Sequence, residues 1–438
     1  MGSGAITSST AGPVASGARI QTLDVIRGAA VLGILLMNIW AFAGPQAFFD
    51  YPLAVADRAG AAVATWTVIH TLFEGSQRAL FSLLFGAGML LLVTRLAAKP
   101  GIRVARIYYR RLFLLITIGL IDAFIFLWPA DILITYGLCG LLLYPLRHQS
   151  TALLIGLALG VFVINAGLRV ADLQEASALR DAYPAALAAP ADDAQAQATV
   201  TAWEKIETRA RPDADSEAVQ ESIRIIGSGK FGEFFAERAK SSLILQTVVA
   251  LNAWLLDALA VMLLGMAALR SGLLTGEVSR RALWLTCLLG YGIGLPLAVA
   301  DTLAHLNSGF DPIVSKQWLV VYDLRRGGVA AGHLGAMLLL CQSGAFAGLQ
   351  ARLACVGRMA LSNYLAQSLL GGLIFYTVGF GLFGQITGWY LYLVVGAIWL
   401  LLITLSNWWL TRFNFGPAEW LWRSLTYRQR QTLRRSAA

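Results

Sequence analysis

The sequence LDVIRGAAVLGILLMNIWAFAGP, residues 23–45, decides the fold class of this chain. After Arg27 it has no ionisable side chain as far as Pro45, and its one amide, Asn38, lies near the far end. An uncharged apolar run of about 18 or more residues is typical of a membrane-spanning helix. Polar side chains inside such a helix are costly and usually face protein, water or ligand. The stretch therefore predicts a transmembrane helix with polar groups at two depths, Asp24 with Arg27 and then Asn38.

The composition of the whole chain predicts a polytopic membrane protein. Of its 438 residues, 57% are hydrophobic and only 13% are charged, whereas a soluble domain carries about 25% charged residues. The formal net charge of +9 predicts cationic cytoplasmic loops rather than nucleic-acid binding, because Lys and Arg are retained on the cytoplasmic side of a membrane. The 4 cysteines lie in or beside apolar segments without metal-ligand spacing, which is typical of small core residues.

The apolar segments predict an all-α fold of about ten transmembrane helices. The expected spans are residues 23–43, 62–94, 112–128, 131–146, 151–170, 242–268, 282–303, 319–342, 358–380 and 388–411. Glu74, Gly75 and Arg78 interrupt the long second span, so we expect a kink or a break there. Arginine-rich loops follow the even-numbered spans, which predicts that both termini lie in the cytoplasm.

One soluble insertion divides the spans into two halves. The expected parts are a disordered tail (1–18), a five-helix transmembrane half (19–170), an extracytoplasmic helical insertion (171–240), a second five-helix half (241–411) and a cytoplasmic amphipathic tail (412–438). The insertion carries 13 acidic and 8 basic residues, a net charge of −5, and is rich in Ala, which favours helices. We expect its turns near Pro184, Pro190 and Pro212.

The end of the insertion has two interpretations. Phe231, Phe234 and Phe235 share one helical face beside Lys230 and Arg238. A helix that lies on the bilayer surface has this pattern. A lid packed on the spans would have it too.

Polar and ionisable side chains in or next to the predicted spans mark the candidate site. The residues that we single out are Asp24, Arg27, Asn38, His70, Glu74, Arg78, Asp122, Asp131, Tyr136, Asp257, His333, Arg358 and Asn363. Three of them, His70, Glu74 and Arg78, share one face of the second span, and this spacing favours a water-filled cavity or an active site over contact with lipid.

Structural roles remain open for several of these residues. Asp24 and Arg27, at positions i and i+3, fit either a surface ion pair or a site that grips a phosphate. Asp131 follows a Trp-Pro break and fits a helix cap as well as a functional carboxylate. His333 fits a satisfied hydrogen-bonding partner or a general base, and Asn38 fits an interhelical hydrogen bond.

No motif indicates a bound cofactor or metal. The sequence contains no P-loop, no HExxH and no paired CxxC. It also shows no clear inverted repeat of broken helices, the usual indication of a secondary transporter.

Five blocks, in order, resemble the YeiB-like family of bacterial inner-membrane proteins. They are LDVIRGAAVLGILLMNIWAF (23–42), RALFSLLFGAGM (78–89), DILITYGLCGLLLY (131–144), VGRMALSNYLAQSLL (356–370) and FGPAEWLWRSLTY (415–427). That family resembles in turn the transmembrane acyltransferase superfamily, which includes enzymes like heparan-α-glucosaminide N-acetyltransferase. The resemblance implies a multi-pass inner-membrane protein that moves an acyl group from cytoplasmic acyl-CoA to an acceptor across the membrane.

The resemblance also has local departures. Asp24 and Arg27 match the first block of the superfamily. Asn38 stands where the glycan O-acyltransferases tend to carry a histidine, and Asp122 stands near a histidine that YeiB-like chains often show in the third span. These differences leave the general base unassigned.

The combined prediction is a cavity that crosses the bilayer and is lined by spans one to four, eight and nine. Asp24, Arg27, Arg358 and Asn363 would hold the phosphates of acyl-CoA, with help from the cluster at residues 103–111. His333 or Glu74 would deprotonate a hydroxyl or amine of a glycan, lipid or small molecule, and Arg78 or Asn38 would stabilise the oxyanion. The other cavity residues would be His70, Asp122, Asp131, Tyr136 and Asp257.

The alternative is a transporter, channel or lipid-handling protein whose permeation path is lined by the same groups. The expected partners are membrane lipid, acyl-CoA, an unidentified acceptor and a second copy of the chain.

Overall fold

The described part of the chain is helical throughout, as the sequence predicts. The computed structural model describes residues 21–45, 47–54, 59–275 and 277–435. Within these residues six helices are long and apolar enough to cross a membrane, and two shorter apolar helices accompany them. These findings confirm the all-helical fold and indicate a membrane protein, while the total of ten spans stays a prediction. The tail at residues 1–18 lies outside the described residues.

The first half contains α1 (Gln21–Ala43), α2 (Ala47–Asp50), α3 (Ala59–Leu72), α4 (Ser76–Ala97), α5 (Val104–Phe124), α6 (Leu133–Leu143), the 3-10 turn η3 (Pro145–His148) and α7 (Thr151–Leu187). The insertion continues with α8 (Ala194–Ala210), α9 (Glu217–Ser228) and α10 (Phe231–Ile244). The second half contains the π-helical segment η4 (Leu245–Trp254), α11 (Leu255–Arg270), α12 (Arg280–Asn307), α13 (Pro312–Val320), α14 (Tyr322–Ser343), α15 (Ala347–Arg358), α16 (Ala360–Phe375), α17 (Tyr390–Arg412) and α18 (Pro417–Tyr427).

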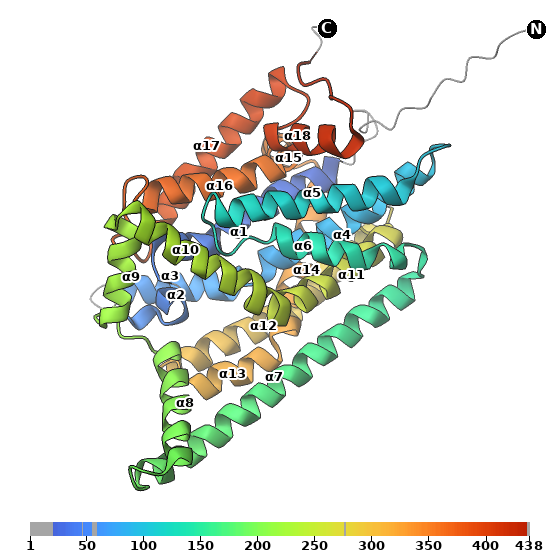
Figure 1. Cartoon of the computed structure of the whole chain (residues 1–438). Helices are drawn as coiled ribbons and strands as arrows, with labels where there is room; N and C mark the ends of the chain where they lie inside the picture. Colours follow the sequence, from blue (N-terminus) through green and yellow to red (C-terminus); the bar gives the residue numbers. More distant parts are fainter. Residues whose placement is uncertain (1–20, 46, 55–58, 276, 436–438) are drawn as a thin grey trace, which may run out of the picture.

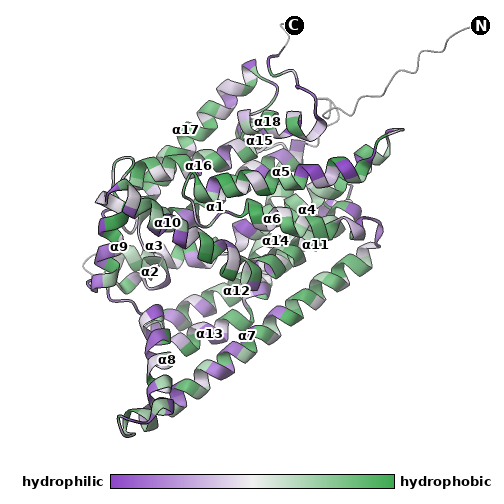
Figure 2. Ribbon diagram, viewed as in Figure 1, coloured by the Kyte–Doolittle hydropathy of each residue, from purple (hydrophilic) through white to green (hydrophobic). Residues whose placement is uncertain are grey.

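The insertion and α18 lie at opposite ends of the helical bundle (Figure 1). Hydrophobic residues cover most of the helices between these ends, and hydrophilic residues gather on α8 and α9 (Figure 2). The long helix α7 runs along one side of the bundle (Figure 1). In its most apolar 18-residue segment only 17% is buried inside the protein. Such an exposed apolar helix is suited to contact with lipid.

The second predicted span is broken, as expected. α3 ends at Leu72 and α4 begins at Ser76, with Gly75 between them at φ 71°. A Cβ at this position would lie 2.5 Å from Oη of Tyr322. The turn thus needs glycine for its left-handed backbone and for the close approach of α14.

The insertion differs from the sequence prediction at one of its three prolines. α7 continues through Pro184 to Leu187, so the turn expected there is wrong. Pro184 removes one backbone hydrogen bond inside the last turn, but the helix continues for only three more residues. Pro190 and Pro212 lie between helices, as predicted.

The end of the insertion packs on the bundle like a lid. Phe234 is fully buried and Arg238 is buried as well, whereas Phe231 and Phe235 are exposed. The ring of Phe234 lies 5.5 Å from that of Tyr376, which follows α16. A helix resting only on the bilayer surface would keep its arginine at the headgroups, so the buried Arg238 favours the lid.

Glycines set the closest helix contacts in the core. On α12, a Cβ at Gly290 would lie 2.3 Å from the backbone nitrogen of Gly332, and one at Gly294 would lie 2.2 Å from that of Val329. These distances are shorter than any carbon–nitrogen contact allows, so α12 and α14 touch backbone to backbone. Small residues are the usual means of such packing in membranes, where lipid removes the hydrophobic drive for helices to associate.

Gly290→Ala is therefore expected to destabilise the protein by about 1–3 kcal/mol, the usual cost of overpacking. Gly292→Ala is the matched control on the same helix, because nothing lies within 4 Å of its added Cβ. Thermal unfolding in mild detergent should show a lower midpoint for Gly290→Ala alone. Equal midpoints for the two variants would contradict the backbone contact.

Candidate functional site

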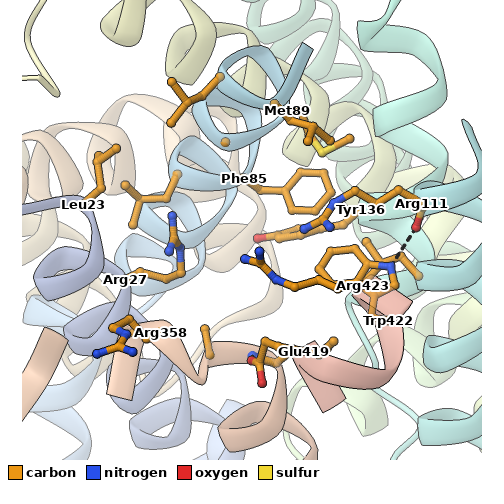
Figure 3. Close-up of a pocket in the computed structure, with 18 of the residues that line it drawn as sticks. Leu23, Arg27, Phe85, Met89, Arg111, Tyr136, Arg358, Glu419, Trp422 and Arg423 are labelled. Atoms are coloured by element: carbon orange, nitrogen blue, oxygen red, sulfur yellow. Dashed lines mark hydrogen bonds between the residues drawn. The ribbon is translucent and has the colours of Figure 1, made fainter. Parts of the chain in front are cut away.

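A pocket of about 720 Å³ lies at the arginine-rich end of the bundle, by which we mean the start of α1, the end of α4, the start of α5 and α18. Its polar wall carries more positive than negative side chains. The cations are Arg27, Arg95, Lys99, Arg111, Arg358 and Arg423, and the carboxylates are Asp24 and Glu419. Figure 3 shows the side chains of Arg27 and Arg423 extending toward the centre of the pocket.

The remaining wall of the pocket is apolar, and its residues are buried or half-buried. It is formed mainly by Phe81, Leu84, Phe85, Met89, Leu115 and Leu133, with Tyr136 and Tyr364 among them. Phe81 and Phe85 pack beside Tyr136, with ring centroids 5.8 and 5.0 Å away. The pocket thus joins a cationic surface to an apolar one, an arrangement suited to an anionic amphiphile.

α18 completes the polar wall because two contacts hold it in place. Glu419 accepts hydrogen bonds from the backbone nitrogens of Leu361 and Ser362, at 2.7 and 3.1 Å, and so caps the start of α16. Trp422 donates to the backbone oxygen of Arg111 at 2.9 Å, and its ring lies 3.5 Å from the Arg111 guanidinium. This docking brings Arg423 into the pocket.

The positive charge of the pocket is incompletely neutralised. Arg27 pairs with Asp24 at 2.7 Å. Burial and the neighbouring Arg423 and Arg27 lower the pKa of Arg111, and burial also lowers the pKa of Arg423. A guanidinium still keeps its proton at neutral pH, and a bound anion would stabilise both charges in this buried surrounding. Nε of Arg111 is buried and hydrogen-bonds to no atom in the described part of the chain.

A second polar region, separate from the pocket wall, is a network of ion pairs in the interior. Arg325 pairs with Glu74 and, at 3.0 Å, with Asp301. Arg326, almost fully buried, pairs with Asp257 and, at 2.7 Å, with Asp323. Buried charges need such partners because an unpaired ion in a low-dielectric interior is strongly disfavoured.

Tyr322 lies at the centre of this network. Its hydroxyl donates to Glu74 at 3.0 Å and accepts from Arg78 at 3.2 Å. Arg78 also pairs with Asp257 at 3.2 Å. The predicted stripe of His70, Glu74 and Arg78 is thus assembled, but its members meet partners from α11, α12 and α14 instead of an open cavity.

His70 belongs to a cluster with Asp301 and His305 whose ligand atoms lie within 4.8 Å of one another. Three such residues could hold a metal ion by composition alone. However, Nη1 of Arg325 lies 3.0 Å from Oδ2 of Asp301 and 3.4 Å from Nε2 of His70. The guanidinium already supplies the positive charge there, so the geometry indicates ion pairing rather than metal binding.

Asp122 and Asp131 form a separate buried pair. The two carboxyl groups are neighbours on one face of α16, because Tyr364 and Ser368, one turn apart on that helix, each donate to one of them. Asp131 also accepts from the backbone nitrogen of Ile134 at 3.0 Å, which agrees with the predicted role at the start of α6. Tyr364 donates to Asp131 at 3.2 Å, and Ser368 donates to Asp122 at 3.0 Å.

Three predicted residues lie outside the pocket lining and outside both polar regions. His333 hydrogen-bonds to Tyr291 at 2.8 Å and to the backbone oxygen of Leu72 at 3.0 Å, so both ring nitrogens are engaged. Asn363 donates to Val356 O and exchanges hydrogen bonds with Ser406 on α17. Asn38 is half-buried on α1.

The prediction of one common cavity is therefore wrong. Of the residues named from the sequence, Asp24, Arg27, Tyr136 and Arg358 line the pocket, and so does Arg111 of the arginine cluster. Most of the others form hydrogen bonds or ion pairs with neighbours within the protein. The sequence pattern predicted the depth of each polar group in the membrane. Which groups are in contact depends on how the helices are rotated and packed.

A polar chain still links the pocket to the interior network. The hydroxyl of Tyr136 lies 2.5 Å from Oγ of Ser82 and 3.4 Å from the backbone oxygen of Arg78. Arg78 in turn reaches Tyr322 and Asp257. Arg78, a member of the network, is thus in contact with Tyr136, a residue of the pocket wall.

Sequence reasoning missed a clamp on the turn between α5 and α6. Arg238, Ser242 and Gln246 recur every four residues on one face of α10 and η4, and all three are buried. Arg238 donates to Leu127 O, Ser242 to Ala123 O, and Gln246 to the carbonyls on both sides of Ala130. The four-residue spacing of polar side chains at the edge of an apolar span was the available signal.

The comparisons with known proteins establish the family. Residues 268–429 match the family described as "Protein of unknown function (DUF418)". "Uncharacterized protein YeiB" of Escherichia coli (strain K12) is 30% identical over 423 residues, which cover 94% of this chain and 97% of that protein. The chain belongs to the YeiB family.

Other relatives of this YeiB-family protein have equally general names. "Uncharacterized protein YxaH" of Bacillus subtilis (strain 168) is 28% identical over 437 residues, covering 95% of this chain and 96% of the relative. "Uncharacterized 39.9 kDa protein in amylase 3'region" of Bacillus acidopullulyticus is 25% identical over 425 residues, covering 95% and 96%. No solved structure matches the chain. The YeiB-like resemblance of the five sequence blocks is thereby confirmed.

The interior network predicts unequal costs for two ion-pair mutations. Arg326→Met leaves Asp257 and Asp323 short of a partner and is expected to cost about 3–5 kcal/mol, as for a broken buried pair. Lys316→Met removes an exposed pair with Asp172 and is expected to cost about 0–1 kcal/mol. Chemical unfolding of both variants in detergent measures the difference. A cost for Arg326→Met as small as that of Lys316→Met would refute the stabilising role of the network.

Proposed function

We propose that this YeiB-family protein is an inner-membrane acyltransferase that takes its acyl group from cytoplasmic acyl-CoA. The observation that carries the proposal is the pocket, in which several guanidinium groups stand beside a buried apolar wall. Acyl-CoA has the same two halves, a phosphate-bearing nucleotide and an acyl chain. Positive charge is retained on the cytoplasmic side of membranes, which supports a cytoplasmic opening for the pocket and cytoplasmic termini.

In this proposal, different pocket residues bind the phosphates and the acyl chain of acyl-CoA. Arg27, Arg111 and Arg423 hold the phosphates, because guanidinium groups match phosphate oxygens in charge and geometry. Arg358 stands on the same wall, and Asp24 orients Arg27 through their ion pair. Phe81 and Phe85 accept the acyl chain, and Tyr136 lies between the two halves of the site.

The chain of contacts beyond Tyr136 supports transfer toward the extracytoplasmic side. Among the predicted catalytic residues, Arg78 and Glu74 connect to the pocket through Tyr136 and Tyr322. We keep Glu74 as the general base for the acceptor and Arg78 as the group that stabilises the oxyanion. His333 and Asn38 have no such connection among the described residues. The acceptor is a hydroxyl or amine of a glycan, lipid or small molecule.

The second candidate function is lipid handling, and the same pocket favours it. An anionic phospholipid also combines a phosphate with apolar chains, and it reaches a membrane protein without leaving the bilayer. Permeation as a transporter or channel would need the ion pairs of the interior network to open. Binding and turnover measurements separate these functions. The expected homodimer is a further proposal that light scattering of the detergent-solubilised protein would test.

Acyl-CoA is expected to stabilise the purified protein against heat, and free CoA to do so less, because it lacks the acyl chain. Arg423→Gln should weaken acyl-CoA binding about 10–100-fold, as for the loss of a charge-assisted hydrogen bond. Arg430→Gln, which changes an exposed arginine of the tail, is the control with unchanged affinity. Calorimetric titration in nanodiscs provides the constants. Equal affinities for the two variants would contradict the proposed site, and tighter binding of anionic phospholipid than of acyl-CoA would favour lipid handling.

Glu74→Gln is expected to lower kcat for acyl transfer about 10²–10⁴-fold, the usual contribution of a general base, while acyl-CoA affinity stays unchanged. His333→Gln serves as the comparison, because both nitrogens of this histidine are engaged within the protein. The assay follows release of free CoA thiol from acyl-CoA with sugar and amine acceptors. Full turnover by Glu74→Gln would remove the assignment of Glu74 as the base.

A further inference from the structure

The carboxyl pair of Asp122 and Asp131 lies next to the pocket but has no place in the binding scheme above. Both side chains are fully buried, with 0% exposure. Asp122 comes from the end of α5 and Asp131 from the turn that leads into α6. Asp131 packs against α5 because Gly119, one turn before Asp122, has no side chain: a Cβ there would lie 2.6 Å from Oδ2 of Asp131.

The neighbours of the pair donate hydrogen bonds but supply no positive charge. Tyr364, Ser368 and the backbone nitrogen of Ile134 all point a hydrogen at a carboxyl oxygen. Neither carboxyl forms an ion pair with a Lys, Arg or His in the described part of the chain. This contrasts with Asp257 and Asp301, each of which faces a guanidinium.

Two adjacent buried carboxyl groups without a cation cannot both be ionised, because the like charges repel strongly in an apolar surrounding. One proton between them removes the repulsion and makes the hydrogen bond that joins them. Oδ1 of Asp122 has no hydrogen-bond partner among the described residues, although it is buried. Burying a carboxyl oxygen without a hydrogen-bond donor costs less free energy on a neutral carboxylic acid than on a carboxylate ion.

We propose that Asp122 and Asp131 form a proton-binding site inside the membrane, which exchanges protons with the pocket through the phenol of Tyr364. Tyr364 lines the pocket and donates to Oδ1 of Asp131, while its own oxygen accepts from the backbone nitrogen of Ile132 at 3.1 Å. The phenol is thus held in place between the two sites.

The exchange needs no further reactant. At rest the pair is one carboxylic acid hydrogen-bonded to one carboxylate. When a proton arrives at the oxygen of Tyr364, the phenol passes its own hydrogen to Asp131 and keeps the new one. The pair then consists of two neutral carboxylic acids, and the reverse step restores it.

The titratable and charged groups around the pair are few. From α16 and its end, the phenols of Tyr364 and Tyr376 act on Asp122 electrostatically. Arg238 of α10 contacts Tyr376, and its guanidinium is engaged by that phenol and by Leu127 O. The pair is therefore protonated and deprotonated mainly through Tyr364. In the proposed acyl transfer it would receive the proton that the acceptor loses; that role rests on the proposed function, whereas the proton site does not.

Infrared spectroscopy of the full-length protein in nanodiscs tests the site without any substrate. At neutral pH the wild type should show a carboxylic-acid C=O band that shifts in D₂O, and Asp122→Asn should lose it, because the remaining Asp131 keeps its hydrogen-bond donors and ionises. Asp172→Asn, at an exposed ion-paired carboxylate, should retain the band. Absence of the band from the wild type, or its persistence unchanged in Asp122→Asn, would overturn the proposal.

A second variant tests the route to the pocket. Tyr364→Phe keeps the ring and should retain the band, but its hydrogen–deuterium exchange should slow about 100-fold, the lower range for loss of a positioned proton-transfer group. Tyr392→Phe, which removes a buried phenol bonded to Trp40 and Leu36 O, is the control with unchanged exchange. Exchange at the wild-type rate in Tyr364→Phe would overturn the route. Failure of acyl-CoA to bind would overturn the proposed function and leave both infrared results in force.

Discussion

Neutralisation of buried charge is the constraint on which this structure depends. Arg326 is almost fully buried, and it is stable there because Asp257 of α11 and Asp323 of its own helix face it. Arg325 is held in the same way by Glu74 and Asp301. Apart from Arg326–Asp323, which lies within α14, these pairs connect different segments of the chain, so they help to specify how α11, α12, α14 and the turn between α3 and α4 assemble. Breaking one pair leaves a charge in an apolar interior.

The protein meets the same constraint differently in its three polar regions. The interior network balances guanidinium groups with carboxylates. At the arginine-rich end, cations outnumber carboxylates around one pocket, and an anion from outside would complete the balance. Asp122 and Asp131 have no cation at all, and a shared proton takes its place. Ligand binding and proton exchange are therefore expected where the chain leaves its own charges unmatched, and structural stability where it matches them.

Part of this arrangement could be predicted from the sequence. The broken second span followed from Gly75 and the charges beside it. Arg27 and Arg358, which were assigned to one anion site, both line the pocket. His333 was predicted as a base and Asn363 as a phosphate ligand, but neither lines the pocket, and both are hydrogen-bonded within the protein. A polar residue in a span signals that some partner exists. The signal is the same whether the partner is a ligand or another helix.

The sequence by itself determined the helical membrane class and the family, because run length, charge and block order are properties of the chain in one dimension. Tertiary structure alone decided which polar groups meet. Arg326 lies 69 residues from Asp257, and no local pattern relates the two positions. Likewise Arg423 enters the pocket only because Glu419 and Trp422 dock α18 against α16 and α5. Such contacts depend on the rotation and tilt of whole helices, which many weak packing interactions set together.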